Sequence, residues 1–184
     1  MARTESNPFP IGTVAPNFNL IDTVSGRDLT FNDIKGEKGT AVFFICNHCP
    51  FVIHINHELA ALAKDYKSKG IGFVAISSND VENYPQDGPE HMHTNAIEQG
   101  FDFPYLYDED QSVAKAYDAA CTPDLYLFDA ENKCYYHGQI DDSRPGNDLP
   151  VTGADFRRAM DLLLEGETYS GQMMPSIGCN IKWK

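Results

Sequence analysis

Two cysteines placed three residues apart are the side chains in this sequence whose type and spacing could do chemistry. Cys46 and Cys49 form a C-x-x-C motif between an apolar run and an amphipathic segment. A thiol at the amino end of a helix is stabilised as a thiolate by unpaired backbone N–H groups and the helix dipole. Because the thiolate is the nucleophilic form, we predict that Cys46 attacks a disulfide bond. Cys49, which opens the helix and lies one turn in, would then resolve the mixed disulfide.

The residues within and after the motif favour the same chemistry. His48 lies between the two cysteines, and its protonated ring would add positive charge that favours a thiolate at Cys46. Pro50 is tolerated in the first helical turn, because the N–H that it lacks would have no partner there. We therefore predict that His48 tunes the redox properties of the pair.

Two other interpretations of the cysteine pair stay open at this point. A C-x-x-C motif is half of a four-ligand zinc site, although the chain has no second such pair to complete it. The two thiols could also be small buried side chains without reactivity. A strand–C-x-x-C–helix context is typical of a redox dithiol, so we assign no metal to the site.

The segments around the motif predict an α/β fold. Residues 40–45 are a continuous apolar run, as expected for a strand buried on both faces. Apolar residues then recur at helical spacing as far as Tyr66, and residues 72–77 read as a second buried strand. Residues 40–77 therefore predict a β-α-β unit with a right-handed crossover. A strand, a short helix, a hairpin and a last helix are expected at residues 105–107, 112–117, 125–138 and 155–164.

A Thr122-Pro123 dipeptide directly precedes the first strand of the expected hairpin. A strand–C-x-x-C–helix unit followed by Thr-Pro before a strand resembles the thioredoxin fold. The resemblance implies a three-layer α/β/α structure with a central mixed sheet and an amino-terminal β-hairpin. Residues 79–100 are polar and punctuated by Pro and Gly, so they are expected to be an insertion with one helix around 91–98. The resemblance also implies that Pro123 is cis and packs against the dithiol, and that the Thr122 backbone binds an extended substrate polypeptide. We expect one domain over 1–184, with its core at about 12–165 and a tail at 166–184.

Three short motifs resemble one branch of that superfamily, the peroxiredoxin-like proteins of the alkyl hydroperoxide reductase/thiol-specific antioxidant type. They are C-N-H-C-P, D-D-S-R-P-G-N and P-S-I-G-C-x-I-K-W, at residues 46–50, 141–147 and 175–183. The resemblance covers nearly the whole chain, from the G-T-V-A-P-N-F segment at 12–18 to the last helix. It implies redox chemistry at the dithiol, either disulfide exchange or antioxidant hydroperoxide reduction.

The peroxidase motif of true peroxiredoxins, P-x-x-x-T-x-x-C, is missing. With Cys49 as its cysteine, Val42 and Cys46 stand in place of proline and threonine, and with Cys46 those places hold Gly39 and Phe43. Thiol–disulfide exchange is therefore the first prediction and hydroperoxide reduction the alternative. A histidine before the second cysteine resembles the more oxidising C-x-H-C proteins, and it implies a reduction potential above the roughly −270 mV of thioredoxin.

Other side chains could join the site. Cys121 could reach Cys46 or be a small buried loop residue, and Cys179 in the tail could fold back as an extra resolving thiol. Cys134 alternates within the hairpin and is expected to be a packing residue. Arg144 lies in an acidic loop, where it either braces a turn or faces the substrate and stabilises a thiolate.

A rival function is copper delivery. Copper-delivery proteins of the same fold use a cysteine pair and a distant histidine, for which His137 is the candidate here, but their motif is C-x-x-x-C. Further histidines lie on the first helix and in the insertion, at positions 54, 57, 91 and 93.

Composition excludes several classes of protein. The 184 residues carry a net charge of −13, from 14 Lys and Arg against 27 Asp and Glu, which argues against nucleic-acid binding. No segment approaches the ~20 apolar residues of a membrane helix, and residues 1–8 lack the apolar core of a signal peptide. The expected location is the cytoplasm. No glycine-rich phosphate loop follows a strand, so no organic cofactor is expected, and the partners are a dithiol electron donor or a disulfide substrate.

Overall fold

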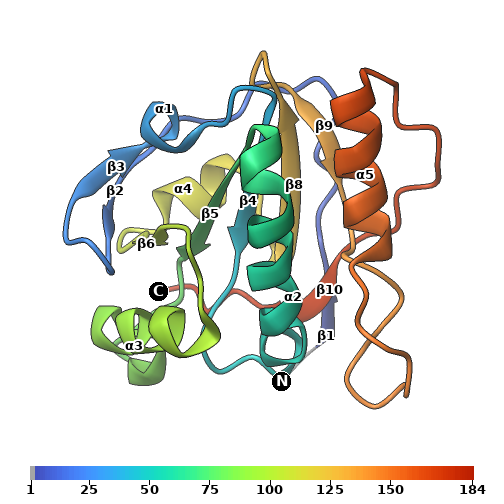
Figure 1. Cartoon of the computed structure of the whole chain (residues 1–184). Helices are drawn as coiled ribbons and strands as arrows, with labels where there is room; N and C mark the ends of the chain where they lie inside the picture. Colours follow the sequence, from blue (N-terminus) through green and yellow to red (C-terminus); the bar gives the residue numbers. More distant parts are fainter. Residues whose placement is uncertain (1–2) are drawn as a thin grey trace.

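The structure is a computed structural model that describes residues 3–184, so the first two residues of the expected domain lie outside it. A seven-stranded mixed sheet has the strand order β3-β2-β6-β5-β4-β8-β9 (Figure 1). The central strand β4 pairs in parallel with β5 and antiparallel with β8. These strands span β2 (Asn19–Asp22), β3 (Asp28–Thr30), β4 (Gly39–Phe44), β5 (Ile71–Ser77), β6 (Tyr105–Tyr107), β8 (Asp124–Asp129) and β9 (Cys134–His137).

Helices cover both faces of this sheet, which confirms the predicted three layers (Figure 1). On one face α2 (Pro50–Tyr66), α3 (Pro89–Gln99) and α5 (Ala154–Glu165) contribute to one apolar cluster. On the other face α1 (Phe31–Ile34) and α4 (Ser112–Ala116) contribute to a second. Because β4 lies between the two clusters, every one of its residues is buried, as its continuous apolar run predicts.

The predicted β-α-β unit and hairpins are present. β4, α2 and β5 form the parallel unit, and β8 and β9 form the carboxy-terminal hairpin with a register shift between Leu127 and Phe128. β2 and β3 form the amino-terminal hairpin. The insertion at 79–100 carries a 3-10 turn, η2 (Pro85–Asp87), and the helix α3. A second 3-10 turn, η1 (Lys67–Lys69), follows α2.

The tail holds a strand that the sequence pattern does not reveal. β10 (Ile177–Asn180) pairs antiparallel with β1 (Arg3–Glu5) on one side and with β7 (Cys121–Thr122) on the other. Figure 1 shows this strand crossing the end of the main sheet where the chain passes from β4 to α2. The tail therefore lies over the cysteine motif. No helix within residues 3–184 combines the length and the apolar character needed to span a membrane.

Candidate active site

The cysteine motif lies where β4 ends and α2 begins, but the helix starts one residue later than predicted. α2 begins at Pro50, and Cys49 is its N-cap residue, whose carbonyl accepts hydrogen bonds from Val52 and Ile53. Cys46 lies three residues before the cap and is buried. The proline sets the helix start at itself, because its fixed backbone angle suits the first helical position. The sulfur nearest the helix amino end is therefore that of Cys49.

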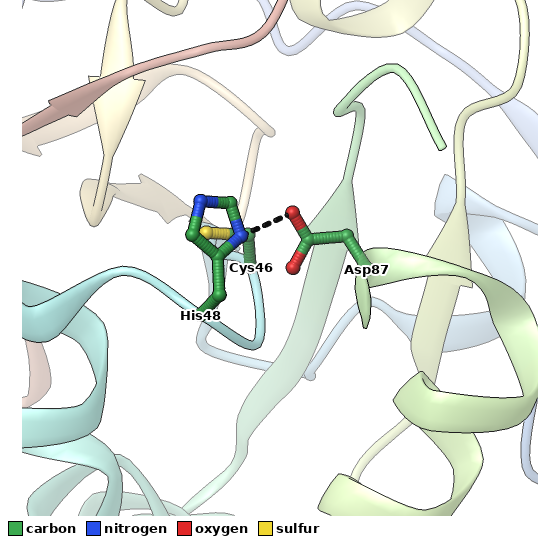
Figure 2. A group of neighbouring side chains, drawn as sticks. All are labelled: Cys46, His48 and Asp87. Carbon is green, nitrogen blue, oxygen red and sulfur yellow. Dashed lines mark hydrogen bonds and ion pairs between the residues drawn. The ribbon is translucent and has the colours of Figure 1, made fainter. Parts of the chain in front are cut away.

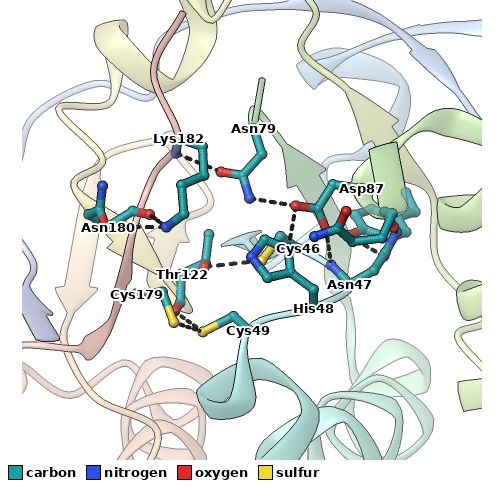
Figure 3. Close-up of polar contacts among 12 residues, drawn as sticks. Cys46, Asn47, His48, Cys49, Asn79, Asp87, Thr122, Cys179, Asn180 and Lys182 are labelled. Atoms are coloured by element: carbon teal, nitrogen blue, oxygen red, sulfur yellow. Dashed lines mark hydrogen bonds and ion pairs between the residues drawn. The ribbon is translucent and has the colours of Figure 1, made fainter. Parts of the chain in front are cut away.

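Thr122 lies between the two thiols of the motif (Figure 3). Its hydroxyl is 3.3 Å from Cys46 Sγ, and its carbonyl oxygen is 3.2 Å from Cys49 Sγ, whose thiol can donate to it. The Thr122–Pro123 peptide bond is cis, as the resemblance implies. The hairpin strand β8 follows Pro123 directly and pairs with β4, so the same sheet positions both halves of the site.

The pKa values of the two motif thiols are shifted in opposite directions. A hydrogen bond from the Cys46 thiol lowers the pKa of Cys49 to about 5, helped by the thiol and amide of Cys179 and the amide of Val52. The same hydrogen bond, burial and the negative charge of Asp87 raise the pKa of Cys46 well above its ordinary value. Within the pair, the pKa of Cys49 is therefore lowered and that of Cys46 is raised.

A third sulfur reaches the motif from the tail. Cys179 Sγ lies 2.7 Å from Cys49 Sγ, and both side chains are buried (Figure 3). Burial raises the pKa of Cys179 to about 12, with a further contribution from its hydrogen bond to Cys49. A thiol with that pKa keeps its proton at neutral pH. The sequence names this residue as a candidate, and the pairing of β10 with β7 brings it to the site.

Asp87 is a site residue that sequence reasoning missed. Its fully buried carboxylate accepts hydrogen bonds from the backbone N–H of Asn47 at 2.8 Å and from the side-chain amide of Asn79 at 2.8 Å. His48 Nδ1 lies 2.6 Å from the same carboxylate (Figure 2). The His48 ring also stacks on Tyr84. His48 thus contacts Asp87, and its donor nitrogen also lies within 4.8 Å of the Cys46 sulfur. No spacing signals Asp87, because it lies 39 residues from His48 in the polar insertion.

The backbone edge at Thr122 is occupied by the protein's own tail. Cys179 stands opposite Thr122 in the β7–β10 pair, and Asn180 stands opposite Cys121. A Cβ atom on Gly178 would lie 1.9 Å from the Thr122 carbonyl oxygen, so this close approach requires glycine. The resemblance implies that this edge binds an extended substrate. In the structure β10 pairs with this edge.

The tail is fixed to the rest of the site beyond β10. The backbone N–H of Lys182 donates to Asn79 Oδ1 at 2.9 Å, and the Lys182 carbonyl accepts from the Asp80 amide and the Gln111 side chain, both at 2.8 Å. Asn79 therefore bonds to the tail with one atom and to Asp87 with the other (Figure 3).

Three other predicted residues direct their side-chain contacts to groups other than the motif sulfurs. The Cys121 thiol donates to the Pro123 carbonyl at 3.5 Å, and the contact with Cys46 that it was a candidate for is made by Thr122. Arg144 donates to the carbonyls of Asp141 and Ser143 and to the Gln139 side chain, so it braces its own loop. These contacts favour the turn-bracing interpretation of Arg144. Cys134 is buried in the apolar cluster beside α1 and α4, as expected for packing.

The metal-donor groups are arranged differently from the copper hypothesis. His137 Nε2 is 2.7 Å from Asp124, and its buried ring stacks on Tyr126, so it is not the histidine partner of the cysteine pair. Among residues 3–184, the cluster with metal-donor chemistry consists of Cys46, His48 and Asp87, whose donor atoms lie within 4.8 Å of one another. His48 and Asp87 in this cluster already bond to each other.

The sequence of this chain is similar to a known protein family and to a curated relative. Residues 11–137 match the model of the AhpC/TSA family. The chain is 30% identical, over 122 residues and 66% of its length, to the thiol-disulfide oxidoreductase ResA of Bacillus subtilis (strain 168). It spans 63% of the length of that relative.

Solved structures share the fold. An uncharacterised conserved protein from Geobacillus kaustophilus is 57% identical, with a TM-score of 0.98 over 100% of this chain and 97% of that one. A thiol:disulfide interchange protein of the thioredoxin family from Chlorobium tepidum TLS is 19% identical, with a TM-score of 0.64 over 85% of this chain and 99% of that one. This second likeness confirms the predicted thioredoxin fold.

Proposed function

This chain belongs to the AhpC/TSA family, and we propose that it catalyses thiol–disulfide exchange through Cys46 and Cys49. The observation that carries the proposal is the hydrogen-bonded thiol pair at the start of α2, in which the pKa of Cys49 falls to about 5. A sulfur with that pKa is a thiolate at neutral pH, without an added base. The curated relative named a thiol-disulfide oxidoreductase supports the same reaction class.

In the proposed reaction the Cys49 thiolate attacks one sulfur of a substrate disulfide. A mixed disulfide forms, and the other substrate sulfur leaves as a thiolate and takes up a proton. Cys46 then gives up its proton and attacks Cys49 Sγ, so that the Cys46–Cys49 disulfide forms and the second substrate thiolate leaves. Two electrons pass from protein to substrate, and an external dithiol restores the reduced protein. In this proposal the two cysteines exchange the roles that the sequence predicts for them.

The test is dithiothreitol-driven reduction of glutathione disulfide by the intact protein. We expect the Cys49→Ser and Cys46→Ser variants each to lose about 100-fold or more in rate, because each lacks one half of the dithiol. Cys134→Ala is the matched control, since this thiol lies in the apolar cluster on the other face of the sheet, and it should keep the wild-type rate. Unchanged turnover in both motif variants would overturn the proposal.

Hydroperoxide reduction is the second candidate, and one observation favours it. In the register of the peroxidase motif that takes Cys49 as its cysteine, Cys46 stands at the threonine position, and its thiol donates a hydrogen bond to Cys49. The Cys49 thiolate would attack the O–O bond of a hydroperoxide and become a sulfenic acid, releasing an alcohol or water. A neighbouring thiol would then form a disulfide with loss of water. Peroxide consumption measured beside the disulfide assay separates the two candidates.

His48 and the cellular setting complete the proposal. We expect a reduction potential above that of thioredoxin, and a lower potential in the His48→Ala variant, which redox titration against glutathione measures. The proposed location is the cytoplasm, where the buried thiols of this site would stay reduced between turnovers. Trapping the thiols of the expressed protein with an alkylating reagent in whole cells tests this.

A further inference from the structure

We infer that Cys179 is a third redox-active thiol, which resolves Cys49 through a Cys49–Cys179 disulfide. The two sulfur atoms lie 2.7 Å apart. A disulfide bond is about 2.05 Å long, so a small side-chain adjustment is enough to form one. This inference rests on the proposed thiol–disulfide exchange and extends it, because it gives Cys49 two partners instead of one.

The backbone holds Cys179 in this position. Cys179 pairs with Thr122 across β7 and β10, and Thr122 itself contacts both cysteines of the motif. Gly178 allows β10 to approach the Thr122 carbonyl closely, and Lys182 fixes the following segment through Asn79. The contact between the two sulfurs is therefore set by a paired strand and its anchor.

The three sulfurs are placed so that Cys49 can exchange partners. Cys46 belongs to the same motif as Cys49, and Cys179 Sγ approaches Cys49 Sγ to 2.7 Å from the other chain segment. Residue exposure is 0% for Cys46, 0% for Cys49 and 3% for Cys179, so both partners are shielded from water. Both can therefore react with Cys49 without entering bulk solvent.

The step balances as an ordinary thiol–disulfide exchange. After Cys49 has attacked the substrate, Cys179 loses its proton and its thiolate attacks Cys49 Sγ in the mixed disulfide. The Cys49–Cys179 bond forms, the bond from Cys49 to the substrate breaks, and the second substrate sulfur leaves as a thiolate. From a Cys46–Cys49 disulfide, the same attack releases Cys46 as the thiolate and changes no net oxidation state.

The Cys49–Cys179 disulfide would also fasten β10 over the site. β10 then occupies the Thr122 edge and is covalently joined to the start of α2. A protein in this state has its tail locked, with Cys46 as the remaining free thiol of the motif.

The experiment oxidises the Cys46→Ser protein with glutathione disulfide and maps its thiols by alkylation under denaturing conditions and mass spectrometry. The chain has five cysteines, so four remain in this variant. We expect two of them, Cys49 and Cys179, to be joined in one linked peptide, and Cys134 to be fully alkylated. Cys46→Ala is a second variant with the same expected result, in case serine disturbs the buried position.

A double variant, Cys46→Ser with Cys179→Ser, is the matched control. It should stop at a Cys49–glutathione mixed disulfide, which clears at least about 10-fold more slowly than in the single variant because the neighbouring thiol is gone. Accumulation of that mixed disulfide in the single variant, with Cys179 fully alkylated, would overturn the inference. Failure of the Cys179→Ser variant to form a Cys46–Cys49 disulfide would instead overturn the proposed function, so the two failures differ.

Discussion

His48 bonds to Asp87, with 2.6 Å between Nδ1 and Oδ2, and this contact joins the cysteine motif to the insertion that follows β5. The carboxylate is fully buried and also accepts from the Asn47 backbone. Its negative charge lies close enough to Cys46 to raise the pKa of that thiol. Asp87 therefore organises the loop of the motif and helps to keep the Cys46 proton in place.

Replacing this carboxylate should make Cys46 more acidic. Asp87→Asn keeps the size of the side chain and removes the negative charge, so the pKa of Cys46 should fall. The pH dependence of Cys46 alkylation, followed by mass spectrometry in a Cys49→Ser background, measures the change. Asp161→Asn is the control, because that carboxylate bonds to Tyr66, the last residue of α2, at the end of the helix away from the motif. An unchanged Cys46 profile in Asp87→Asn would contradict the role given to the charge.

The low pKa of Cys49 predicts how the reactivity of this thiol depends on pH. With the pKa of Cys49 at about 5, its alkylation rate should rise through pH 5 and stay flat from pH 6 to 8. Cys46→Ala removes the main hydrogen bond to the thiolate, so the pKa of Cys49 should rise and the rate at pH 6 should fall.

A conservative variant checks the cause of that shift. Cys46→Ser keeps a hydrogen-bond donor, so it should restore part of the low pKa that Cys46→Ala loses. Ultraviolet absorbance of the thiolate against pH gives an independent reading. Equal pKa values for Cys49 in the alanine and serine variants would show that the donor at position 46 does not act on the sulfur.

Because β10 lies so close to the Thr122 carbonyl at Gly178, we predict that a side chain at position 178 displaces β10 from the Thr122 edge. In Gly178→Ala the new Cβ would meet the Thr122 carbonyl oxygen, which should displace β10 and cost about 1–3 kcal/mol in the free energy of unfolding. The freed Thr122 edge should speed reduction of a protein disulfide, such as that of insulin, more than reduction of glutathione disulfide.

The matched control for this variant is Gly171→Ala, in the same tail. A Cβ there meets only the side chain of Tyr169, at 3.1 Å, and that side chain can shift. Denaturant unfolding and the ratio of the two reduction rates are measured for both variants. A Gly178→Ala protein with the wild-type ratio would show that β10 does not limit access to the dithiol.

Removing the Thr122 hydroxyl should change the pKa of Cys46 less than removing the Asp87 charge. Thr122→Val keeps the shape of the side chain but loses the hydroxyl 3.3 Å from Cys46 Sγ. Because this hydrogen bond lowers the pKa of Cys46, its loss should raise that pKa further and slow the second step of disulfide exchange. Thr122→Ser retains the hydroxyl and should behave like the wild type. Rapid mixing of the reduced protein with glutathione disulfide resolves the two steps.

The sequence by itself determined the thioredoxin fold and the place of the dithiol. A continuous apolar run before Cys46 and helical spacing after Cys49 are local patterns, and burial on both faces of a sheet imposes them directly on the residue types of β4 and α2. The Thr122-Pro123 dipeptide is equally local, and its cis bond matches the resemblance.

Only the tertiary structure decided which groups surround the two sulfurs of the motif. Asp87 and Cys179 reach the motif from 39 and 130 residues away, through an insertion and a tail without sequence periodicity. The helix start at Pro50 makes Cys49 the capping residue, and β10 fills the edge that a substrate was expected to use. Hydrogen bonds and charges set a thiol pKa through distances of a few ångströms, and such distances between remote segments are fixed by packing and strand pairing.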